Sequence, residues 1–190
     1  MKKIGILGDI GSGKSFVAKQ FGCPIFNADN EVNKIYKKSK LCFKKLRKKL
    51  PKYIKSYPIN KAEISKAILA NNKNLFIISK IVHPLIRKKM NLFLKKNNNK
   101  KIVILDIPLL IENKLNKKKD ILIYVDAKNK DIQTRLTKRK RYNKKLIKKL
   151  KKMQYSIFKK KRISNYIIKN NFKPMIIKKK VEIIKNKILN

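Results

Sequence analysis

The feature that most constrains this chain is a glycine-rich segment near its start, residues 8–15, which reads Gly-Asp-Ile-Gly-Ser-Gly-Lys-Ser. An apolar run at residues 3–7 precedes it and predicts a buried strand, and residues 16–21 follow with the pattern of a helix. Glycine allows backbone torsions that a Cβ forbids, so successive N–H groups can turn toward an anion at the start of a helix. Strand, G-x-x-x-x-G-K-S and helix together predict a phosphate-binding P-loop.

The lysine and the serine of a P-loop have distinct roles in binding phosphate and metal. Lys14 would reach the β- and γ-phosphates of ATP, and the Ser15 hydroxyl would ligate Mg²⁺. A plain glycine turn followed by an ordinary surface lysine is the alternative, but the complete motif in its strand–helix context favours ATP and Mg²⁺ as cofactors. The residues expected to bind ATP here are Gly8, Gly11, Ser12, Gly13, Lys14, Ser15 and Phe16.

The remaining apolar segments predict a parallel sheet. The segment at residues 102–105 is continuous and β-branched, as a central parallel strand should be. We therefore expect an α/β, three-layer P-loop NTPase fold, in which helices flank a five-stranded parallel sheet. One domain would cover residues 1–190, with its core at 1–29, 101–130 and 163–190. The further strands are expected at residues 25–28, 121–125 and 165–168.

The segments outside this core read as helices. Residues 30–100 contain no convincing strand, and their apolar residues recur at helical spacing, which predicts a helical insert. Within it we expect a new helix to start at Pro84, directly after the only histidine, His83, which is more often a structural cap or a packed ring than a base. Residues 131–162 predict a basic helical lid, and residues 176–189 predict a closing helix.

Two acids follow predicted strands. In an open parallel sheet, ligands bind beyond the carboxyl ends of the strands, so Asp29 and Asp106 should face the P-loop. Asp106 is placed to hold Mg²⁺ with Ser15, directly or through water. Asp29 could act on a substrate or cap the helix that begins near Glu31, and both roles remain open.

Arginine is scarce in this lysine-dominated chain, yet Arg135, Arg139 and Arg141 lie together in the predicted lid. The planar guanidinium makes bidentate contacts with phosphate that lysine cannot make. A lid that closes over a triphosphate would use such arginines, and we expect Arg135 and Arg139 to contact ATP. Ordinary solvated helix charge is the alternative.

The net charge of +44, from 54 Lys and Arg against 10 Asp and Glu, must attract polyanions at low salt. The excess is mostly lysine, spread from end to end and accompanied by Asn and Ile, which fits drift toward A/T-rich codons. We therefore expect nonspecific attraction rather than dedicated nucleic-acid binding. No apolar run predicts a membrane span, and Cys23 and Cys42 have no disulfide or metal spacing, which suits the cytoplasm. A monomer or a small homo-oligomer is compatible with this sequence.

The order of motifs along the whole chain resembles the dephospho-CoA kinase family. The P-loop is shared by many families, whereas its combination with Ala-Asp after the second strand, His-Pro in the helical insert and Pro-Leu-Leu-x-Glu after the third strand is more specific. The resemblance rests on residues 4–15, Asn27-Ala28-Asp29, residues 81–86 and 106–112, Gln133-Thr134-Arg135 with Arg139, and Gln154 with residues 164–170.

The resemblance implies transfer of the ATP γ-phosphoryl group to the ribose 3′-hydroxyl of dephospho-CoA, giving CoA and ADP. Asp29 would accept the hydroxyl proton, while Lys14 and Arg139 would stabilise the transferred group. The acceptor dephospho-CoA would meet Asp29, His83, Pro108, Leu109 and Glu112.

Several positions depart from the family pattern. Asp9 brings a carboxylate near the triphosphate and should weaken ATP binding unless it points away. Asn27 replaces an acid, which leaves Asp29 as the single candidate base, and Phe16 replaces a small hydroxyl residue. Three alternatives remain: another P-loop kinase for nucleoside monophosphates or shikimate, a basic nucleic-acid-binding protein regulated by ATP, and an inactive kinase fold.

Overall fold

The computed structural model describes residues 1–138 and 142–190, which divide into two compact units. The first unit comprises Met1–Asn27 and Asn97–Asn190, and it contains the sheet. The second unit is the segment Ala28–Lys96, which is helical. Each unit is described separately below.

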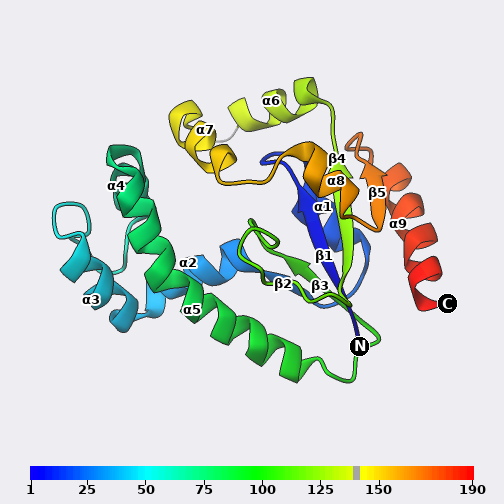
Figure 1. Ribbon diagram of the computed structural model, residues 1–190, viewed down its shortest axis with the longest axis horizontal. Helices are drawn as coiled ribbons and strands as arrows, with labels where there is room; N and C mark the ends of the chain where they lie inside the picture. The colour runs from blue at the N-terminus through cyan, green and yellow to red at the C-terminus, as the bar shows by residue number, and fades with distance from the viewer. Residues whose placement is uncertain (139–141) are drawn as a thin grey trace. The chain divides into compact units, whose positions relative to one another are not determined.

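The first unit is built on a five-stranded sheet of order β2-β3-β1-β4-β5 (Figure 1). Every neighbouring pair is parallel, so the predicted fold class is confirmed. The P-loop strand β1 lies between β3 and β4, which places the carboxyl end of β3 beside the loop. The strands are β1 (Lys2–Gly8), β2 (Ile25–Asn27), β3 (Ile102–Asp106), β4 (Ile121–Asp126) and β5 (Tyr166–Lys169).

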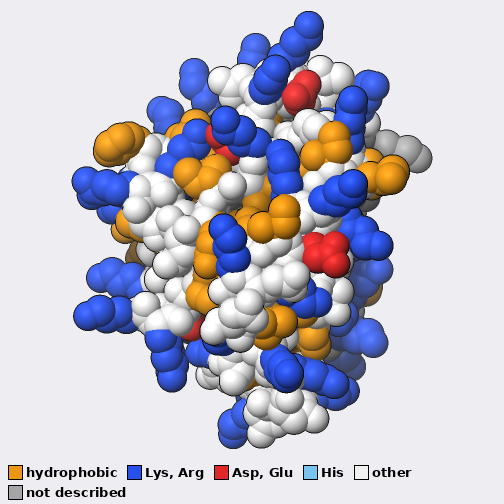
Figure 2. Space-filling model, turned by 90° about the vertical axis from the view of Figure 1, so that its right-hand side faces the viewer, with side chains coloured by type: hydrophobic (Ala, Val, Ile, Leu, Met, Phe, Trp, Pro, Cys, Tyr) orange, Lys and Arg blue, Asp and Glu red, His pale blue; other side chains and the backbone are white. Residues whose placement is uncertain are grey.

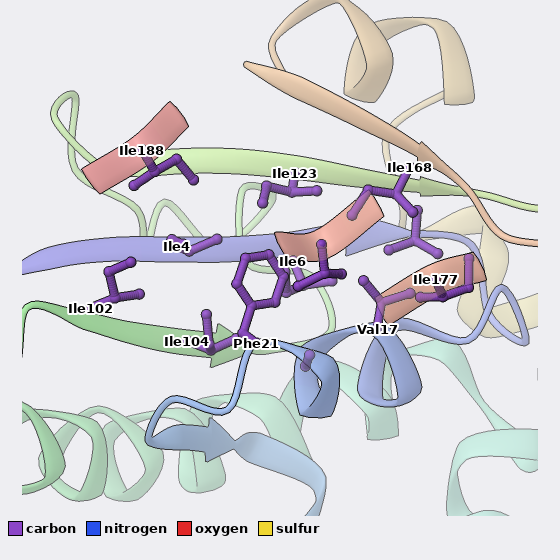
Figure 3. Packing of buried hydrophobic residues seen from close by; sticks show 13 residues of the cluster. Ile4, Ile6, Val17, Phe21, Ile102, Ile104, Ile123, Ile168, Ile177 and Ile188 are labelled. Atoms are coloured by element: carbon purple, nitrogen blue, oxygen red, sulfur yellow. The ribbon is translucent and has the colours of Figure 1, made fainter. Parts of the chain in front are cut away.

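The main core of this unit lies between the sheet and the helices α1 (Lys14–Gln20) and α9 (Pro174–Leu189). Ile4 and Ile6 of β1 belong to one buried cluster with Val17 and Ile177 (Figure 3). Alternate residues of a strand face opposite sides, and Gly5 accordingly meets Leu110 and Leu122 instead. Both faces of β1 are thus covered, as its continuous apolar sequence requires.

Three short helices follow β4 in the segment that was predicted to be a helical lid. They are α6 (Asn129–Thr137), α7 (Lys144–Lys152) and α8 (Ile157–Arg162). Side-chain oxygens of Asn143 and Ser156 accept hydrogen bonds from the first-turn amides of α7 and α8. These caps fix where the two helices begin.

The second unit contains α2 (Ala28–Lys38), α3 (Lys40–Lys49), α4 (Lys61–Ala70) and α5 (Asn72–Lys96). The expected absence of strands holds throughout this unit. Helix α5 packs against α2, α3 and α4 through buried residues at helical spacing, namely Ile78, Val82, Ile86 and Met90. None of the helices in the described ranges is long and apolar enough to cross a membrane.

The prediction that a new helix starts at Pro84 is wrong, because Pro84 lies inside the continuous helix α5. Proline removes one i→i−4 hydrogen bond. The buried stripe through Val82 and Ile86 continues past Pro84, and its packing outweighs that local loss. The predicted start near Glu31 also lies too late, since α2 begins at Ala28 and Asp29 belongs to its first turn.

Candidate active site

The P-loop is shaped by glycines that no other residue could replace without a clash. Gly8 has φ 148° and Gly13 has φ 89°, both in the region that favours glycine. A Cβ on Gly8 would approach the Val125 carbonyl oxygen to 2.8 Å. A Cβ on Gly13 would collide with the side-chain amide of Asn170. The loop therefore keeps the backbone geometry that its motif predicts.

The donors of this loop suit a phosphate group. The Lys14 ammonium donates to the carbonyl oxygens of Gly8 at 3.1 Å and Asp9 at 2.8 Å, so it spans the loop from its C-terminal end. In the part of the chain that the structure describes, the buried Ser12 hydroxyl has no hydrogen-bond partner. Buried hydroxyls are normally paired, so this one fits a loop that a bound ligand completes.

Ser15 and Asp106, the two candidate metal ligands, lie in direct contact. The Ser15 hydroxyl donates to Asp106 Oδ2 at 2.5 Å, and the Asn27 amide donates to the same oxygen at 2.6 Å. The Asp106 carboxylate is 3% exposed and lies at the carboxyl end of β3. A hydroxyl and a carboxylate of this kind are the protein groups that hold Mg²⁺ beside a P-loop.

The segment after β3 forms a hollow beside the P-loop. Pro108, Leu109 and Glu112 line it together with Gly8 and Lys14. Leu109 has φ 58°, a conformation that costs energy for a residue with a Cβ and that is found preferentially at functional sites. Three of the five residues expected to meet the acceptor thus line one small hollow together with Lys14.

The predicted lid helix α6 packs directly on the P-loop. Ile132 and Leu136 leave no room for a Cβ on Gly11, where the approach would be 3.0 Å. The Arg135 guanidinium lies 4.2 Å from the centre of the Phe172 ring, a distance at which cation–π attraction is effective. Arg139 and Arg141, the other arginines of interest, fall outside the described residues.

Asp29 and His83 belong to the helical unit. Asp29 is exposed in the first turn of α2, two residues after Asn27. His83 lies in the middle of α5, and burial lowers its pKa below the ordinary value of 6.5, with a further lowering from the positive charge of Arg87. Because His83 lies inside a continuous helix, a cap at a helix start is not its role.

Sequence reasoning missed some residues that hold this site together. The amide of Asn170 donates to the Ser12 carbonyl oxygen at 2.8 Å and fastens the P-loop to the end of β5. Asn27, which replaces an acidic residue of the family pattern, donates a hydrogen bond that orients Asp106. Lys160 forms an ion pair with Asp9. A polar residue at the end of a predicted strand was the sequence signal for Asn170. This signal could not identify the partner, Ser12, which lies 158 residues away in the sequence.

Comparisons with known proteins agree with this geometry. The family model described as dephospho-CoA kinase matches residues 2–174. A dephospho-CoA kinase of Bartonella quintana (strain Toulouse) is 37% identical over 132 residues, which cover 67% of each chain.

Solved structures show the same fold. Protein TT1252 of Thermus thermophilus superposes with a TM-score of 0.76 at 20% identity, covering 98% of this chain and 97% of its own. A dephospho-CoA kinase from Campylobacter jejuni gives a TM-score of 0.64 at 19% identity, with the same coverage of 98% and 97%. The match of the family model over residues 2–174 and the Bartonella relative show that this chain belongs to the dephospho-CoA kinase family, a family of transferases.

Proposed function

We propose that this chain transfers the γ-phosphoryl group of ATP to the ribose 3′-hydroxyl of dephospho-CoA, giving CoA and ADP. The observation that carries the proposal is the P-loop whose Ser15 hydroxyl contacts Asp106 within a chain of this family. Phosphoryl transfer depends on positioning and charge stabilisation more than on covalent chemistry by the protein. The residues below supply those two functions.

In this proposal the backbone amides from Gly11 to Phe16 bind the phosphates, and Lys14 reaches the β- and γ-phosphates. Arg135 and Arg139, from the proposed lid of residues 131–162, would contact the triphosphate and exclude water. The packing of the buried residues Ile132 and Leu136 against Gly11 supports a lid whose first helix is anchored on the P-loop.

Ser15 and Asp106 would hold Mg²⁺. The ion, when bound, neutralises charge that develops on the phosphate oxygens during transfer. The hydrogen bond from Asn27 keeps one Asp106 oxygen directed at Ser15, which supports a role for Asn27 in aligning the carboxylate.

Asp29 would accept the proton of the attacking hydroxyl. Its exposure in the first turn of α2 supports access to substrate. His83, Pro108, Leu109 and Glu112 would contact dephospho-CoA. Pro108, Leu109 and Glu112 line a small hollow with Lys14, which supports a place for these residues beside the phosphates.

The acceptor is tested by measuring ADP release from Mg·ATP with dephospho-CoA, shikimate, AMP or CMP in parallel. We expect dephospho-CoA alone to stimulate ADP release, with CoA as the product. Equal or greater stimulation by shikimate or a nucleoside monophosphate would contradict the proposed acceptor while keeping the kinase fold.

A further inference from the structure

Asp9 introduces a negative charge into a loop that must bind a polyanion. It is the second residue of the P-loop motif, and its side chain is 14% exposed. Two like charges about 8 Å apart, at an effective dielectric constant of about 20, repel enough to change a binding constant by roughly tenfold or more. An uncompensated Asp9 would therefore weaken ATP binding.

Lys160 supplies the opposite charge. Its ammonium lies 3.5 Å from Asp9 Oδ1 and donates to Gln154 Oε1 at 2.9 Å. The Lys160 side chain is only 3% exposed, although it belongs to the short, otherwise solvated helix α8. Lysine is almost never buried so completely unless it is paired. The burial of Lys160 therefore depends on its partners Asp9 and Gln154.

Asp9 also connects the two lysines that line the hollow. Its carbonyl oxygen accepts from Lys14, while its carboxylate faces Lys160. On the side of β4, burial raises the pKa of Tyr124, and the carboxylates of Asp9 and Asp126 raise it further. The Asp9 carboxylate thus has Lys160 as its ion-pair partner and acts electrostatically on Tyr124.

We infer that Lys160 is a positioning residue for ATP binding, which holds the Asp9 carboxylate and cancels its charge so that the P-loop stays attractive to phosphate. The inference deepens the proposed function and rests on it, since ATP is the ligand concerned. The effect of Asp9 on ATP affinity should therefore depend on whether Lys160 is present, and the effect of Lys160 should depend on whether Asp9 is present.

The test is a double-mutant cycle read out as the Kd for Mg·ATP. Lys160→Met leaves the carboxylate unpaired, and we expect the Kd to rise about tenfold or more. Asp9→Asn alone leaves the Lys160 ammonium unpaired, so the same argument predicts that the Kd stays at the parent's value or falls. The double variant Asp9→Asn/Lys160→Met carries neither charge and should bind ATP within about threefold of the parent.

Lys159→Met is the matched control, since it removes the same charge from the same helix. The Lys159 ammonium lies over the Tyr155 ring, 3.5 Å from its centre, and it should not affect ATP affinity. Thermal unfolding of each variant shows that it is folded. Where Lys160→Met does not fold, the comparison of the double variant with the parent decides, because a variant that lacks both charges should keep the parent's Kd.

Two results would overturn the inference. One is an unchanged Kd in Lys160→Met, and the other is a loss of affinity that persists in the double variant, which would mean that Lys160 acts through α8 packing or on the nucleotide itself. A parent protein that binds no ATP would instead contradict the proposed function, and this inference with it.

Discussion

Asp106 is the residue on which the proposed metal site depends. It is nearly buried at the end of β3, and one of its oxygens accepts from both Ser15 and Asn27. Hydrogen bonds to a charged group contribute about 1.5–3 kcal/mol each, so two of them fix the carboxylate firmly beside the P-loop. A divalent cation bound here would meet a preformed pair of oxygen ligands.

We predict that Ser15→Ala removes most of the effect of Mg²⁺ on ATP binding. The hydroxyl is one of the two proposed protein ligands, so its loss should lower the affinity for Mg·ATP by about tenfold or more. The measurement is an ATP titration with Mg²⁺ and with EDTA. Ser65→Ala, the same substitution in α4, should behave as the parent. An unchanged Mg²⁺ dependence in Ser15→Ala would contradict the assignment of Ser15 to the metal.

At the scale of elements, the sequence predicted what depends on short-range patterns. The buried strand at residues 102–105 and the loop at residues 8–15 were recognisable because burial and backbone torsion act within a few residues. The hydrogen bond from Asn170 to Ser12 joins positions 158 residues apart, and no local pattern shows it. The pair Asp9 and Lys160 was missed for the same reason, since only the fold brings α8 to the P-loop.

Helix α5 shows a local rule that packing overrides. Proline ordinarily ends a helix because it lacks an N–H and its ring crowds the preceding turn. Pro84 is exposed, and the buried residues Val82 and Ile86 on either side of it carry the helix through. The sequence alone could not weigh these two effects, because the partners of the buried face come from α2, α3 and α4.

We predict that Pro84→Ala stabilises the protein. An exposed proline in a helix interior costs up to about 3 kcal/mol relative to alanine, so the substitution should add about 1–3 kcal/mol. The check is urea unfolding of the parent, of Pro84→Ala and of Lys88→Ala, the last being an exposed control in the same helix. A lower unfolding midpoint for Pro84→Ala would indicate that residues 72–96 do not form one continuous helix.

At the scale of the whole molecule, acids are scarce and lysine is everywhere. The chain has 10 acidic and 54 basic residues. On the side of the molecule shown in Figure 2, Lys and Arg side chains are spread over the surface and do not gather in one patch. Several of these acids nevertheless have specific partners in the unit that holds the sheet. Asp9 pairs with Lys160, Glu112 accepts from the Tyr155 amide, and Asp126 pairs with Lys161, in addition to the contacts of Asp106.

We predict that binding of a labelled single-stranded RNA is tight at low salt and independent of its sequence. A dispersed positive field acts through released counterions, so the affinity should fall by a factor of about 10³ or more between 50 and 200 mM salt. Fluorescence anisotropy at several salt concentrations, with two unrelated RNA sequences, measures both properties. Saturable binding of one sequence that survives 200 mM salt would favour a nucleic-acid-binding function.

The most direct test of the account is the formation of CoA from dephospho-CoA and Mg·ATP by the purified chain, with Asp29→Asn and Glu31→Gln assayed beside it. The account predicts CoA formation by the parent and by Glu31→Gln, which alters the same turn of α2. Asp29→Asn should be slower by about 100-fold or more while it keeps the parent's Kd for ATP, because a general base contributes about that much. A parent that binds ATP but forms no CoA would contradict the central claim, and full activity in Asp29→Asn would contradict the proposed base.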